Sequence, residues 1–65
     1  MAPKLYARIV RFSRAVELLA AGGALTDVAL AAGYYDQPHM NADFRELSGL
    51  TPRAFAIREQ LTGAS

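Results

Sequence analysis

The sequence predicts an all-α fold, a small bundle of about four helices that contains one helix-turn-helix unit. Apolar residues recur at steps of three and four, the spacing that places them on one face of a helix. Glycines at positions 22–23, 33 and 49 divide the chain into segments of helical length, and glycine is common just past a helix end. We therefore expect a single helical domain over residues 1–65, because a chain of this size has room for only one small core.

The first predicted helix runs from about Pro3 to Ala21 and ends at the Gly22-Gly23 pair. Its apolar residues form one stripe that is expected to face the core: Leu5, Ile9, Phe12, Val16 and Leu19. Tyr6 and Val10 lie off this stripe, so the helix has a second apolar patch. A second patch predicts a second neighbour, which this short chain need not contain. Basic residues of the helix follow the same steps on an adjacent face, where a solvated surface is the simplest interpretation: Lys4, Arg8 and Arg11, with Arg14 one turn further on.

The second and third helices are predicted from about Leu25 to Ala31 and from about Gln37 to Ser48. Gly33 can take positive φ at the end of the first of these, and Asp36 can cap the second with its side-chain oxygen. Small apolar residues allow the two helices to cross closely: Val28, Ala29 and Ala32. The inward face of the third helix is expected to consist of Met40, Phe44 and Leu47. This pattern is typical of a helix-turn-helix, whose second helix can lie in the major groove of DNA.

The fourth helix is predicted from Pro52 to about Leu61, with Thr51 as its N-cap. Phe55 and Leu61 are expected to attach it to the core. The start of the second helix is expected to be less stable than the other helix starts, because Ala24 occupies its N-cap position.

Composition excludes several classes of protein. The chain has 52% apolar and 20% charged residues and no cysteine, which favours a globular domain without a disulfide framework or a thiolate zinc site. We find no apolar run of membrane-spanning length, no signal peptide and no catalytic motif, so we expect a cytoplasmic protein that is not an enzyme and needs no cofactor. The net charge is +1. Residues 1–23 carry a local charge of +3 and residues 24–65 a local charge of −2.

The pattern of motifs resembles the C-terminal part of the DNA-binding domain of AraC/XylS-type transcription regulators. The matching segments, which span about Leu5 to Glu59, are Arg11-Phe-x-x-Ala15-x-x-Leu18-Leu19, Leu25-x-x-Val28-Ala29-x-x-x-Gly33-Tyr34, Asp36-Gln-x-His39-Met40, Phe44-Arg45-x-x-x-Gly49 and Thr51-Pro52-x-x-Phe55. The resemblance implies a homeodomain-like fold and a bacterial, sequence-specific DNA-binding module. Members of that family carry two helix-turn-helix units joined by a long central helix. It therefore also implies a fragment or truncated form, which has the central helix and the second unit and lacks the first.

Two departures from the family pattern bear on DNA affinity. Ala42 stands where the recognition helix commonly has arginine, two residues before the inward Phe44, and Ala56 stands where the closing helix commonly has another. Both arginines would be candidates for base or phosphate contacts. We therefore expect weaker phosphate anchoring than in a typical second unit.

Candidate DNA contacts cluster at the start of the third helix. Gln37, His39 and Asn41 are predicted to meet base edges, since Gln and Asn can pair with adenine and His can reach an acceptor or a phosphate. The alternative is that these are ordinary polar residues on a solvated first turn. Arg45 and Arg53 are the predicted phosphate contacts, and no metal site is expected at His39 because no Cys or second His accompanies it.

A competing hypothesis is a protein-interaction or self-association module that keeps the helix-turn-helix fold and has little DNA affinity. Tyr6 and Val10 would then form the interface with a second copy of the chain. The acidic residues of the second half are most simply caps and surface charge: Asp27, Asp36, Asp43 and Glu46. They would otherwise form an acidic surface for a protein partner, and the resemblance makes RNA polymerase the candidate.

Overall fold

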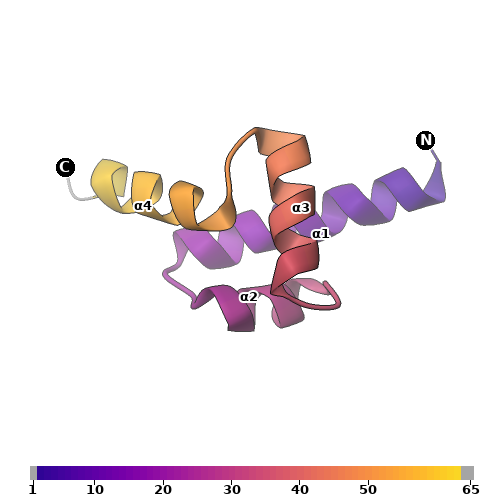
Figure 1. Cartoon of the computed structure of the whole chain (residues 1–65), viewed down its shortest axis with the longest axis horizontal. Helices are drawn as coiled ribbons and strands as arrows, with labels where there is room; N and C mark the ends of the chain where they lie inside the picture. Colours follow the sequence, from indigo (N-terminus) through magenta and orange to yellow (C-terminus); the bar gives the residue numbers. More distant parts are fainter. Residues whose placement is uncertain (1, 64–65) are drawn as a thin grey trace.

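The structure, a computed structural model, describes residues 2–63. This part of the chain consists of four helices and contains no strand (Figure 1). They are α1 (Pro3–Ala20), α2 (Leu25–Ala32), α3 (Gln37–Ser48) and α4 (Pro52–Gly63). The predicted all-α fold class is confirmed. Residues 1, 64 and 65 of the predicted domain lie outside the described residues.

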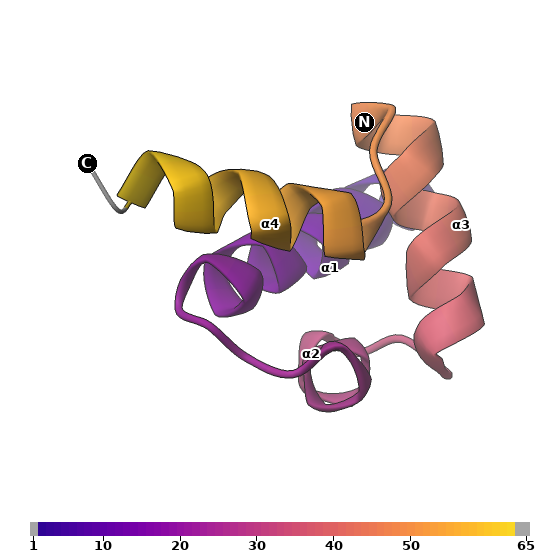
Figure 2. The ribbon, with the colours of Figure 1, turned by 60° about the vertical axis from the view of Figure 1, so that its left-hand side comes forward.

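Helix α1 is the longest of the four helices, and the other three pack against it. It runs along the longest dimension, and α2, α3 and α4 pack around its C-terminal half, while its N-terminal half projects beyond them (Figure 1). Seen from a second direction, α4 lies alongside α1, and α3 stands at a steep angle to both beyond the start of α4 (Figure 2). The dimensions of 39 × 21 × 16 Å reflect this projecting half.

The core lies where all four helices meet. It consists of the buried residues Ala15, Leu19, Val28, Ala29, Ala32, Tyr34, Met40 and Phe44. Phe44 is central to it, because its ring contacts Phe12 of α1 at a centroid distance of 4.8 Å and Phe55 of α4 at 5.4 Å. One side chain of α3 thereby joins three helices, and tilted aromatic pairs of this kind add to the hydrophobic contribution of their burial.

The predicted core extends too far at both ends of the molecule. Leu5 and Ile9 belong to the predicted inward stripe of α1 but are exposed, because the other helices pack mainly against the C-terminal half of α1 (Figure 1). Leu47 and Leu61 are exposed as well, since the ends of α3 and α4 extend past the helices beneath them. Phe55, by contrast, is half-buried against the core as predicted.

The connection between α1 and α2 is close-packed. A Cβ placed on Gly23 would lie only 2.8 Å from Cγ2 of Val28 and 3.1 Å from the carbonyl oxygen of Leu18. Gly23 is therefore required by close approach, and it allows α2 to fold back against the end of α1.

Candidate nucleic-acid interface

The turn between α2 and α3 fixes the direction in which α3 leaves. Gly33 ends α2 with φ 98°, in the left-handed region, and the N–H of Tyr34 donates to the carbonyl of Ala29 at 2.9 Å. Asp36 then starts α3 in an extended conformation, and its Oδ1 accepts from the N–H of His39 at 3.0 Å. The roles predicted for Gly33 and Asp36 are confirmed, and they produce the sharp angle between the two helices in Figure 2.

Helix α3 has one buried face and one open face. Met40 and Phe44 are fully buried beneath it, so the opposite side points away from the molecule. This open face carries Pro38, Ala42 and Arg45, three exposed residues separated by steps of four and three. Ala42 is small, so its methyl group allows a close approach by another surface.

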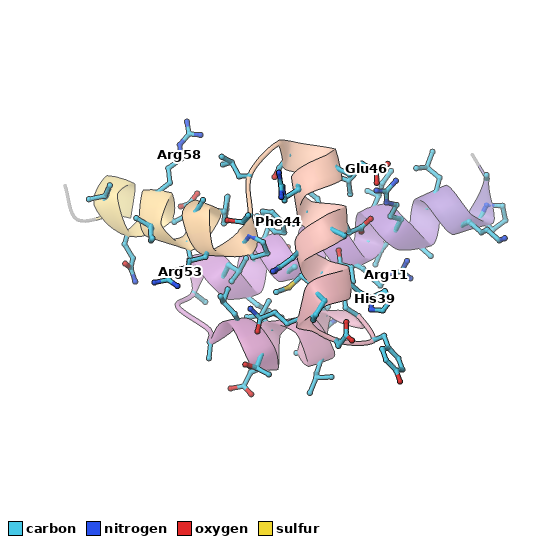
Figure 3. The ribbon with its side chains drawn as sticks, in the orientation of Figure 1. Arg11, His39, Phe44, Glu46, Arg53 and Arg58 are labelled. Atoms are coloured by element: carbon cyan, nitrogen blue, oxygen red, sulfur yellow. The ribbon has the colours of Figure 1, made fainter. Side chains whose placement is uncertain are left out.

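The three predicted base readers do not lie in one row. Gln37 and Asn41 are one turn apart and share one flank of α3, where both are half-buried. His39 is half a turn away from each of them and lies on the other flank, near Arg11 of α1 (Figure 3). Oδ1 of Asn41 is buried and has no hydrogen-bond partner within the described residues.

His39 is held by its own turn. Its Nδ1 lies 2.5 Å from Oδ1 of Asp36, and its ring meets the edge of the exposed Tyr35 ring at a centroid distance of 5.5 Å. The side-chain hydrogen bond with His39, followed by the backbone N–H of the same residue, lowers the pKa of Asp36 below its ordinary value. Since Nδ1 is engaged, Nε2 is the ring atom left to meet an outside group.

The two predicted phosphate contacts are exposed. Arg45 lies on the open face of α3, and Arg53 lies in the first turn of α4, on the side of α3 opposite His39 (Figure 3). Neither guanidinium forms an ion pair with another described residue. Thr51 caps α4 as predicted, because its Oγ1 accepts from the N–H of Ala54 at 3.1 Å. The helix start next to Arg53 is therefore well formed.

The two positions where the family pattern commonly has arginine have different environments. Ala42 is exposed at the centre of the open face of α3. Ala56 is half-buried and packs against the core, where α4 lies over the end of α1. Only the first of these positions therefore leaves a clear gap in the positive charge of the open face.

Arg8 of α1 forms a polar link to α3 that the sequence did not predict. Its Nε donates to Oδ1 of Asp43, and its second guanidinium nitrogen lies 2.8 Å from Oε2 of Glu46. The hydroxyl of Tyr34 donates to the other oxygen of Asp43 at 3.0 Å. The hydrogen bonds accepted by Asp43 and Glu46 raise the pKa of Arg8 above its ordinary value. The interpretation of Asp43 as surface charge, and of Arg8 as part of a solvated face, is therefore wrong.

Two further arginines of α1 hold the helix-turn-helix unit. The Arg11 guanidinium lies over the ring of Tyr34, 5.8 Å from its centroid, in a cation–π arrangement. Nε of Arg14 donates to the carbonyl of Ala31 at 2.9 Å and so satisfies an otherwise open carbonyl in the last turn of α2. Burial, and secondly the hydrogen bond to Asp43, raises the pKa of Tyr34 to about 12.

Neither a metal site nor a membrane span is found within residues 2–63. No three side chains of His, Cys, Asp or Glu gather there as possible metal ligands. None of the described helices combines the length and the apolar character that crossing a bilayer requires.

Comparison with known proteins identifies the family. The model of a family described as "Helix-turn-helix domain" matches residues 1–58, which is most of the chain. Searches of the curated proteins and of the solved structures gave no match. The match covers the turn, the open face of α3 and the supporting α1 together. The chain therefore belongs to the AraC-type family of helix-turn-helix DNA-binding domains.

Proposed function

We propose that the chain is the second helix-turn-helix unit of an AraC-type transcription regulator, mounted on its central helix, and that α3 reads a specific DNA sequence. The observation that carries this proposal is the open face of α3. The face is left uncovered by the other helices, and Arg45 on it has no ion-pair partner among the described residues. A helix face that its own fold leaves open and that carries an arginine without an acidic partner can enter the major groove as a recognition helix.

The proposed contacts divide by chemistry. Arg45 and Arg53 bind phosphates, because exposed guanidinium groups without acidic partners can pair with phosphate oxygens. Gln37 and Asn41 read bases from one flank of α3, and His39 reads from the other. The amide groups of Gln and Asn side chains can each form two hydrogen bonds with adenine. In this arrangement each flank of α3 faces a different part of the groove.

The affinity of this unit should be low and only moderately dependent on salt. Two phosphate contacts release few counterions, and the slope of log K against log salt is then about −1.8. The alanine at position 42 supplies no third cation on the open face. Anchoring is therefore weaker than in a unit with an arginine at that position.

The experiment is a fluorescence anisotropy titration with a short labelled duplex, selected from a random pool by the wild-type chain. Binding should be measurable at low ionic strength and decline as salt rises. Arg45→Met and Arg53→Met should each weaken binding and reduce the salt slope by about one. Lys4→Met is the matched control, because it removes one charge from the first turn of α1, away from α3. Absence of binding even at low ionic strength would overturn the proposal.

Base reading is tested separately from phosphate contact. Asn41→Ala should lower the preference for the selected duplex over a scrambled one by about tenfold, without changing the salt slope. Gln37→Ala and His39→Ala should act at other base positions, because they reach the groove from different places on α3. Equal loss of affinity for both duplexes would mean that these residues do not read bases.

A second candidate function is self-association through the N-terminal half of α1. Leu5, Tyr6, Ile9 and Val10 are all exposed there and form a patch that we name the α1 patch. Large apolar residues that gather on a surface commonly mark an interaction site. A second copy of the chain is the proposed occupant of this patch. The molecular mass in dilute solution distinguishes self-association from a monomer that binds only DNA.

A further inference from the structure

The link between α1 and α3 acts on both oxygens of one carboxylate. Arg8 binds Oδ1 of Asp43 from the central helix, and the hydroxyl of Tyr34 binds Oδ2 from the turn before α3. Arg8 also reaches Glu46, almost one turn further along α3. One guanidinium and one phenol thereby connect three parts of the chain at the side of α3.

This link is sheltered from water. The side chain of Asp43 is 15% exposed and that of Arg8 is 26% exposed, whereas Glu46 is largely open to solvent. A sheltered ion pair is less screened than a surface pair, and loss of one partner leaves the other charge poorly solvated. The contact of Arg8 with Asp43 is therefore the stronger part of the link.

The link adds directional contacts to the apolar packing that holds α3. Met40 and Phe44 attract α3 to the core through apolar contact, which has no preferred direction. Hydrogen bonds are directional, and those on Asp43 act on one side of α3. They resist rotation of α3 about its own axis, and such a rotation would turn the open face away from its proposed position in the groove.

We propose that Arg8 is a positioning residue for DNA binding, which sets the rotation of α3 through Asp43 and Glu46 without touching DNA itself. This inference rests on the proposed function, in which α3 is the recognition helix. Arg8 also cancels negative charge on α3, and the experiment separates that effect from positioning.

The first measurement compares Arg8→Met with Lys4→Met in binding to the selected duplex. Both variants remove one positive charge from α1, but only the first breaks the link to α3. We expect Arg8→Met to weaken binding by about tenfold and Lys4→Met by less than about twofold. Arg8→Lys should lie between Arg8→Met and the wild type, because a lysine ammonium lacks the planar fork that reaches two carboxylates. Equal effects of Arg8→Met and Lys4→Met would overturn the inference.

The second measurement removes charge imbalance from the comparison. In the double variant Arg8→Met, Asp43→Asn, one positive and one negative charge are removed together, so the link is broken and the net charge stays that of the wild type. Positioning predicts that the double variant stays weaker than the wild type by at least about threefold at every salt concentration. Recovery to wild-type affinity would mean that Arg8 acts by charge alone and would overturn the inference.

A third variant covers the case in which Arg8→Met does not fold, which far-ultraviolet circular dichroism would reveal. Tyr34→Phe removes one hydrogen bond to Asp43 and leaves every charge in place. It should weaken binding by about threefold with an unchanged salt slope, and unchanged affinity would count against positioning. If the wild type itself binds no duplex, the proposed function fails and the inference fails with it. If the wild type binds and Arg8→Met binds equally well, only the inference fails.

Discussion

Asp43 accepts one hydrogen bond from the charged Arg8 guanidinium and one from the neutral Tyr34 hydroxyl, and the second of these bonds affects the pKa of Tyr34. Tyr34 is buried, its ring lies beneath the Arg11 guanidinium, and its hydroxyl donates to a carboxylate. Ionisation of the phenol would remove that hydrogen bond and place two negative charges together. Burial, and secondly this hydrogen bond, therefore raise the pKa of Tyr34 to about 12 in the folded state, compared with 10.0 for an ordinary tyrosine.

Alkaline pH should weaken the fold through this group. Below pH 10 the phenol is protonated in both the folded and the unfolded chain, so its contribution is fully present. Between pH 10 and about 12 the unfolded chain releases the proton while the folded chain retains it, and stability falls as pH rises. The loss should reach about 2 kcal/mol in urea unfolding. Tyr34→Phe should lack this part of the decline, and an identical decline in both proteins would contradict the assignment.

At the scale of residues, the sequence predicts local contacts well and distant ones poorly. Asp36, Thr51 and Gly33 act on groups within four residues of themselves, and their roles follow from residue type and position. The partners of Asp43 lie 35 and nine residues away. Their meeting depends on the crossing of α1 and α3, which no local pattern specifies.

Helix α2 differs from α3 and α4 in how it begins. Ala24 has the extended conformation of an N-cap residue, with φ −69° and ψ 143°, but no side chain that can accept a hydrogen bond. Asp36 and Thr51 supply that acceptor for α3 and α4. The first turn of α2 therefore lacks the side-chain cap that α3 and α4 have.

Ala24→Ser should stabilise the fold. A serine hydroxyl at this position can accept from a free N–H in the first turn, and the gain should be about 1 kcal/mol in the free energy of unfolding. The matched control is Ala31→Ser, the same replacement at an exposed position in the last turn of α2. That change should be neutral or slightly destabilising. A gain of equal size in the control would refute the capping explanation.

At the scale of elements, periodicity indicates which residues share a helix face but not how far a neighbour extends over it. Leu5 and Ile9 have the same spacing as Phe12, and only Phe12 is met by another helix. Leu61 has a favourable position on α4, but α4 extends past the end of α1 (Figure 1). The helices themselves could be predicted because their starts and ends are marked by local residues.

Two parts of the whole molecule differ in character. The open face of α3, near the middle of the long axis, carries the exposed Arg45, whereas the projecting half of α1 presents the α1 patch (Figure 1). A chain with a net charge of only +1 has little long-range repulsion to keep copies apart. Contact between two such patches would bury apolar surface that a single copy leaves in water.

Tyr6→Glu should therefore reduce any self-association of the chain. Tyr6 is exposed at the α1 patch, so a carboxylate there disfavours a buried apolar contact without disturbing the core. Sedimentation equilibrium over a range of concentrations measures the effect. Leu30→Glu provides the control, because Leu30 is an exposed apolar residue of α2 away from the patch. If the wild-type chain stays monomeric at every concentration, the proposed self-association is wrong.

The series of three aromatic rings also determines which part of the molecule opens first. Helix α4 is attached to the bundle through its first two turns, where Pro52 is buried and Phe55 contacts Phe44, and its later Ile57 and Leu61 are exposed. Such a helix can unfold locally while the contact of Phe12 with Phe44 holds the rest together. Amide hydrogens of α4 should therefore exchange with solvent faster than those of α3. DNA bound at Arg53 would slow that exchange, because the duplex would then favour the state in which α4 is folded.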